Sequence, residues 1–212
     1  MVWRGKRLPA ALIGAWLTVA SASAAFGATV TFGSRAAFGA AFPNAAIENW
    51  DIYSDNLIIP DGFSLDGIVY NASGPGDAVV TNSFFTSTPP NGLGSTPGEF
   101  FAGTQTMTFG FGAPVVAFGI DINTFAVANG AYQAVTNLGE VVPSVFDPFP
   151  GVPTGQFIGF ATTLAFTSIT ISSPASNVYT LDTLRFVVVP EPASLLLLGM
   201  GLVALARARR LT

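Results

Sequence analysis

Carboxylates are the side chains in this sequence that could do chemistry. The 212 residues include no histidine and no cysteine, so hydrolase triads and cysteine–histidine dyads cannot be assembled. Zinc and copper sites lack their preferred imidazole and thiolate ligands for the same reason. The single lysine, Lys6, lies in an N-terminal segment that we expect to be removed, which excludes Schiff-base chemistry. No glycine-rich phosphate loop opens a helix as a nucleotide site requires.

Two chemistries remain open to the carboxylates. Calcium takes six to eight oxygen ligands, and no EF-hand pattern is present to supply them. Candidate calcium ligands are Asp182, Asp121, Glu48 and Asp51. Glycoside hydrolysis needs two acids across a cleft at a set separation, and 11 of the 12 acidic residues lie between positions 48 and 182, so such pairs always exist. Calcium is therefore the one cofactor that the residues suggest. No residue is assigned a catalytic role.

Of these four acidic residues, Asp182 has the most informative position. The stretch "NVYTLDTLRF" places it in the alternation of the apolar residues, and a carboxylate that faces a core needs a partner. Arg185 or a metal ion could supply that partner. The alternative is a bulge that turns Asp182 outward, or hydrogen bonds from Asp182 to loop amides. Asp121 shares a strand face with Asn123, and we expect that face to be solvated.

Aromatic residues add a second possible binding element. Their rings could form a platform on which sugar rings stack; the candidates are Trp50, Tyr53, Tyr70, Tyr132 and Tyr179. Core or edge packing is the alternative, and we expect it for most of the five.

The elements that must position these residues are short strands. "TQTMTFGF" and "VVAFGIDIN" alternate with period two, and "GFSLDGIVYN" does so more loosely. "LAFTSITIS" changes parity, which predicts a bulge. Further strands are expected at 29–33, 46–51, 78–82, 98–102, 131–136, 156–161 and 177–188, and loops at "NASGPGD", "STPPNGLGSTPGE" and "FDPFPGVPTG". "SRAAFGAAFP" predicts one short helix, with Ser34 as N-cap and Pro43 as its end. The pattern predicts an all-β fold, a single jelly-roll-like antiparallel β-sandwich over residues 29–189.

The N-terminal segment has the pattern of a secretory signal peptide. Arg4, Lys6 and Arg7 precede an apolar stretch from Leu8 to Ala20, and small residues follow. We expect signal peptidase to remove residues 1–28 or a slightly shorter segment. The alternative is an N-terminal membrane anchor.

The C-terminal segment, "VPEPASLLLLGMGLVALARARR", combines two prolines around an acid, an apolar run and a basic end. Pro190 and Pro192 hold Glu191 on a stiff, non-helical segment. The 14 positions from 193 to 206 carry no charge, and as a helix they would cover about 21 Å. Three arginines follow, at Arg207, Arg209 and Arg210. By the positive-inside rule they would stay on the cytoplasmic side.

This segment, 190–212, resembles the sorting segment of the PEP-CTERM family of exported bacterial proteins. The resemblance implies transient anchoring in the inner membrane through the hydrophobic helix and cleavage near Pro190-Glu191-Pro192 by an exosortase. It further implies transfer of the exported domain to the cell surface or extracellular matrix, in Gram-negative bacteria that make exopolysaccharide and biofilm. The stretches "PVVAFGIDIN", "GQFIGF" and "YTLDTLRF" are similar to jelly-roll exodomains of that family. An ordinary single-span anchor is the alternative.

The charge of the central domain limits its partners. Between the two terminal segments only Arg35 and Arg185 are basic, against 11 carboxylates, which gives a net charge near −9. Nucleic acid is excluded as a partner because phosphate binding needs a basic surface. Neutral extracellular polysaccharides remain plausible. We therefore expect a non-enzymatic structural or adhesive domain; the alternatives are a calcium-supported carbohydrate-binding module and, less favoured, a carboxylate glycoside hydrolase.

Overall fold

The described part of the protein is built almost entirely of antiparallel strands and has one short helix, α1 (Arg35–Ala41). The computed structural model describes residues 28–124 and 128–189. The predicted signal peptide, except residue 28, and the predicted sorting segment lie outside the described residues. The strands are β1 (Thr29–Thr31), β2 (Ala46–Glu48), β3 (Ile58–Ile59), β4 (Ser64–Leu65), β5 (Ile68–Ala72), β6 (Ala78–Thr81), β7 (Gly92–Ser95), β8 (Met107–Thr124), β9 (Gln133–Thr136), β10 (Val141–Pro143), β11 (Val145–Phe146), β12 (Gln156–Ser172) and β13 (Tyr179–Val188).

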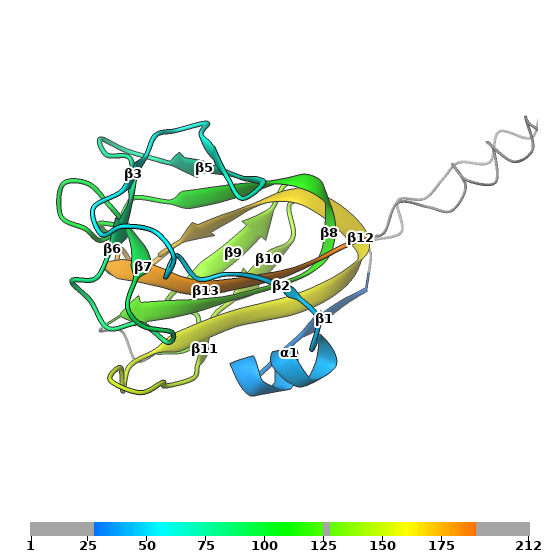
Figure 1. Ribbon diagram of the computed structural model, residues 1–212. Coiled ribbons are helices and arrows are strands. Elements are labelled where there is room, and N and C mark those ends of the chain that lie inside the picture. Colours follow the sequence, from blue (N-terminus) through cyan, green and yellow to red (C-terminus); the bar gives the residue numbers. More distant parts are fainter. Residues whose placement is uncertain (1–27, 125–127, 190–212) are drawn as a thin grey trace, which may run out of the picture.

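Two long bent strands, β8 and β12, belong to both layers of the fold (Figure 1). The first half of β8 pairs with β5, and the facing half of β12 pairs with β9. Beyond the bend lies the second layer, in which β8 lies between β12 and β13, while β12 pairs with β1 and β11 at its other edge. The prediction of an antiparallel β-sandwich is confirmed, and its jelly-roll connectivity stays a prediction.

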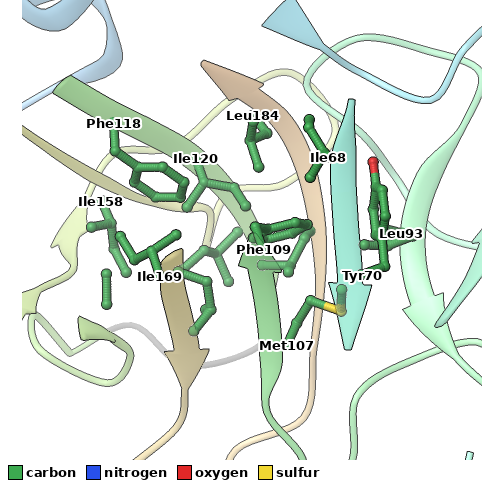
Figure 2. Close-up of a cluster of buried hydrophobic side chains, with 14 of the residues drawn as sticks. Ile68, Tyr70, Leu93, Met107, Phe109, Phe118, Ile120, Ile158, Ile169 and Leu184 are labelled. Carbon is green, nitrogen blue, oxygen red and sulfur yellow. The ribbon is translucent and has the colours of Figure 1, made fainter. Parts of the chain in front are cut away.

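The main core lies between these two layers and is rich in aromatic rings. Figure 2 shows Met107 and Phe109 from the first half of β8 in the same cluster as Tyr70 from β5 and Leu184 from β13. Phe118 and Ile120 from the second half of the same strand also belong to it. The strand alternation read from "TQTMTFGF" and "VVAFGIDIN" is therefore confirmed for the apolar face.

Helix α1 covers part of the outer face of the second layer. The predicted N-cap is confirmed, because Ser34 Oγ accepts a hydrogen bond from the Ala37 amide at 3.1 Å. Phe38 is buried against Phe157. Two paired glycines, Gly119 and Gly159, make room for these rings, since a Cβ on Gly159 would lie 2.3 Å from Phe157 and 3.3 Å from Phe38.

Two predictions about strands differ from the structure, and a third is confirmed. Residues 98–102 form only an isolated bridge through Phe101. The stretch predicted as the loop "STPPNGLGSTPGE" contains β7, which is buried throughout between β13 and β6. Glycine permits this strand, because a Cβ on Gly94 would lie 1.9 Å from the Glu99 carbonyl oxygen. The parity change in β12 is confirmed as a register shift on each side of Phe166.

Candidate functional site

The four predicted acidic residues lie in two separate places. Asp121 of β8 and Asp182 of β13 are direct cross-strand partners on the outer face of the second layer. Glu48 ends β2, and Asp51 follows it in the next loop. Within the described residues, no group of three or more acidic side chains is close enough to hold a metal ion. The calcium site stays a prediction.

Asp182 does not face the apolar core, so the inward orientation suggested by the strand alternation is not the one observed. Thr183 has a left-handed backbone conformation, with φ of 46°, and the pairing of β13 with β8 shifts between Asp182 and Arg185. This irregularity turns Asp182 to the side opposite Leu184, as the alternative of a bulge and loop amides anticipated. Its carboxylate accepts hydrogen bonds from the Thr88 amide at 2.8 Å and the Thr183 amide at 2.7 Å.

Asp121 is completely buried, and the prediction of a solvated face is wrong for this residue. The N-terminus of α1 and the loop 82–91 cover it. Arg35 Nε donates to Asp121 Oδ1 at 2.9 Å, while Arg185 Nη1 lies 3.9 Å from Asp121 Oδ2. The predicted partner of Asp182 therefore pairs with Asp121 instead, and Arg185 Nη1 makes no hydrogen bond within the described residues.

A single serine hydroxyl joins the two carboxylates. Ser87 Oγ lies 2.5 Å from Asp121 Oδ2 and 2.8 Å from Asp182 Oδ2. A serine has one proton to donate, so its hydroxyl can donate to only one of the two carboxylates at a time. Burial raises the pKa of Asp182 to about 6, and the nearby charge of Asp121 acts in the same direction. Burial also raises the pKa of Asp121, and Arg35 opposes that shift.

The second acidic pair holds another loop in place. Glu48 Oε1 accepts the Trp50 amide at 2.9 Å, and burial raises the pKa of this carboxyl. Asp51 Oδ1 accepts the amide of Asn91 at 3.0 Å, which ties its loop to the end of the loop 82–91. Close to this pair, the Tyr53 hydroxyl donates a hydrogen bond to a further acid, Asp66. All four predicted residues thus serve as anchors for loops in this structure.

The predicted aromatic platform is mostly core. Trp50 is fully buried, and its Nε1 donates to Tyr70 Oη at 3.1 Å. Tyr132 and Tyr179 are buried and pack edge to face. Partly buried Tyr53 packs against the same core. The alternative of core packing is therefore the one that the structure favours.

The most open aromatic surface comes instead from phenylalanines of the loop 82–91 and its surroundings, which the sequence analysis did not single out. Phe85 is 68% exposed, and Phe84 packs edge to face on Phe100. The consecutive pair Phe84-Phe85 is a signal that the sequence offers. Two successive residues of an extended segment point to opposite sides, so one of the two rings is expected to face solvent.

Two adjoining cavities lie beside these rings. The larger, about 340 Å³, is lined by Ser83, Phe84, Phe85, Asn123, Thr124 and the loop residues 151–154. The smaller, about 110 Å³, shares Phe84, Asn123 and Thr124 with it and extends toward Phe100 and Tyr179. Neither lining includes a carboxylate, so the buried acids are not placed to act on a ligand in either cavity.

Comparison with known proteins identifies the C-terminal segment. The family described as the PEP-CTERM protein-sorting motif matches residues 188–210. The chain carries a PEP-CTERM sorting motif. The PEP-CTERM match starts at Val188, the last residue of β13, so it adjoins the described fold directly. Such a motif implies export to the cell envelope.

Other comparisons add little to this finding. No curated protein matches the chain. Two solved structures that match are both the family 11 carbohydrate-binding module from Clostridium thermocellum. The module of cellulase Lic26A-Cel5E has 10% identity and a TM-score of 0.30, over 66% of this chain and 98% of that one. The module in complex with a β-1,3-1,4-mixed-linked tetrasaccharide has 11% identity and a TM-score of 0.31, over 66% and 99%. Similarity at this level carries no conclusion about the ligand of this chain.

No helix in residues 28–124 and 128–189 has the length and apolar character needed to cross a membrane.

Proposed function

We propose that this chain is an exported protein sorted by an exosortase, whose β-sandwich has a non-enzymatic structural or adhesive role at the cell surface or in the extracellular matrix. The observation that carries the proposal is the PEP-CTERM motif at residues 188–210. Its position supports the proposal too. Strand β13 pairs with β8, β2 and β7 and ends at Val188. Cleavage near Pro190-Glu191-Pro192 would therefore release the sandwich with its last strand intact.

Substitutions in the sorting segment test this proposal. Glu191→Ala removes the acid between the two prolines, and a separate variant replaces Arg207, Arg209 and Arg210 with serine. Each is expected to leave an uncleaved form in the membrane fraction, whereas the control Thr212→Ala, which keeps the three arginines, is sorted normally. Normal release of the Glu191→Ala and triple-arginine variants would contradict exosortase sorting.

A carbohydrate-binding module is the second candidate function. The cavity beside the exposed Phe85 favours it. The sequence suggested that calcium supports such a module, but the described residues contain no cluster of three acids that could bind the ion. The two candidates are compatible, since a module that binds extracellular polysaccharide would also be adhesive.

A further inference from the structure

The larger cavity combines an aromatic wall with polar groups that can accept hydrogen bonds. Phe84 and Phe85 provide the rings, and Ser83 and Thr154 are among the other lining residues. Ser83 Oγ donates to Glu99 and Thr154 Oγ1 donates to the Thr124 carbonyl. A hydroxyl whose proton is already donated keeps lone pairs. These two side chains therefore present acceptors to a ligand that brings O–H donors.

The charge around the cavity excludes an anionic ligand. No lysine or arginine is present among its lining residues. Both arginines of the described chain point to Asp121, through Arg35 at 2.9 Å and Arg185 at 3.9 Å. Since the central domain has a net charge near −9, an acidic ligand would meet repulsion with no compensating cation.

Hydrogen bonds to backbone groups of the loop 82–91 hold Phe85 in its exposed position. Asn123 Nδ2 donates to the Phe85 carbonyl at 2.7 Å. Three residues further on, the Thr88 amide donates to buried Asp182 at 2.8 Å. Gly151 allows the ring to approach, since a Cβ there would lie 3.0 Å from Phe85 Cδ1. A ring fixed in this way loses little freedom when a ligand stacks on it.

We propose that this cavity binds one or two rings of a neutral saccharide chain, with Phe85 stacking on the apolar face of a sugar ring. This inference rests on the proposed function, which places the domain where such chains occur. The cavity volume of about 340 Å³ is near the lower end of small-ligand pockets, which are roughly 300–1,000 Å³. Stacking on an aromatic face combines with hydrogen bonds from the sugar hydroxyls to Ser83 and Thr154.

The test uses the exported protein purified from its producing cells. Calorimetric titrations use neutral cello-, xylo-, manno- and galacto-oligosaccharides, with oligogalacturonate as the anionic probe. We expect at least one neutral probe to bind and the anionic probe not to bind. Phe85→Ala should weaken binding roughly tenfold, because it removes the stacking ring, whereas Phe85→Tyr keeps the ring and should retain binding.

Phe63→Ala is the matched control, since Phe63 is 52% exposed and does not line the cavity. Thermal unfolding of each variant shows that the fold is intact. Absence of binding to every neutral probe, equal binding by Phe85→Ala, or preference for the anionic probe would each overturn the saccharide site. Any of these results in a correctly cleaved and exported protein would leave the proposed function standing. If the protein is not sorted, the proposed function is contradicted, whatever the protein binds.

Discussion

Asp121 and Asp182 lie directly opposite each other on β8 and β13 with the Ser87 hydroxyl between them, at 2.5 and 2.8 Å. One hydroxyl proton cannot satisfy two ionised carboxylates at once. Because both residues are buried, the pKa of each carboxyl is raised, which links the stability of the fold to pH.

Lowering the pH from 7 toward 4.5 is expected to stabilise the protein through Asp182. Its pKa is raised in the folded state from 3.8 to about 6. A carboxyl with a raised folded pKa contributes stability that is complete below the unfolded pKa and is lost as the pH rises through the folded pKa. The full contribution is about 3 kcal/mol. Thermal unfolding measured in steps between pH 4 and pH 8 would show the slope.

Asp182→Asn separates this contribution from general charge effects. The asparagine cannot ionise, so the slope between pH 4 and pH 7 should flatten, although one backbone amide loses its acceptor and stability falls at all pH values. Asp77→Asn is the control, because the described hydrogen bonds of Asp77 involve only its backbone. An unchanged slope in Asp182→Asn would contradict the raised pKa of Asp182.

Removing Arg35 is expected to destabilise the protein more than removing Arg185. Arg35→Ala breaks a hydrogen-bonded ion pair at 2.9 Å and leaves Asp121 buried, at a cost of about 3 kcal/mol. Arg185 lies 3.9 Å from the same carboxylate, so its removal should cost about 1 kcal/mol. Urea unfolding measures both. Adding Asp121→Asn to Arg35→Ala should recover part of the loss, and a fully additive double variant would argue against the pairing.

Whether chelation matters distinguishes arginine from calcium as the partner of these acids. If Arg35 and Arg185 neutralise Asp121, excess EDTA leaves the unfolding temperature of the protein unchanged, since no calcium contributes to the folded state. Re-addition of calcium then also has no effect. A fall on chelation that calcium reverses would instead assign a calcium site to the predicted acids.

The same glycine-to-alanine change should have opposite effects at two positions around α1. Gly39 lies inside the helix with nothing within 4 Å of an added Cβ, so Gly39→Ala should stabilise the protein by about 0.5–1 kcal/mol. Gly159→Ala places a Cβ 2.3 Å from Phe157 and should destabilise it by about 1–3 kcal/mol. Chemical unfolding of the two variants tests how α1 packs. Equal changes in stability for the two variants would mean that the space left by Gly159 does not position Phe157.

The sandwich could be predicted because strand alternation and turn residues are local signals. The helix cap at Ser34 was predictable for the same reason, since an N-cap depends on a few adjacent residues. Strand β7 was not, because its glycines lack any apolar alternation and serve the close approach of other backbone segments.

The orientation of Asp182 needed information beyond the local pattern. A parity count assumes a regular strand, and the left-handed Thr183 shifts every later residue to the other face. Burial of Asp121 was missed for a related reason: alternation shows which residues share a face, but not that a helix and a loop from elsewhere cover it. The partner Arg35 is 86 positions away in the sequence.

The intact mass and cell fraction of the protein from its producing cells would test the central claim most directly. We predict a product that lacks both the N-terminal segment and the PEP-CTERM segment, found at the cell surface or outside the cell. A mass that retains residues 190–212, found in the inner membrane, would contradict exosortase sorting and indicate an ordinary membrane anchor.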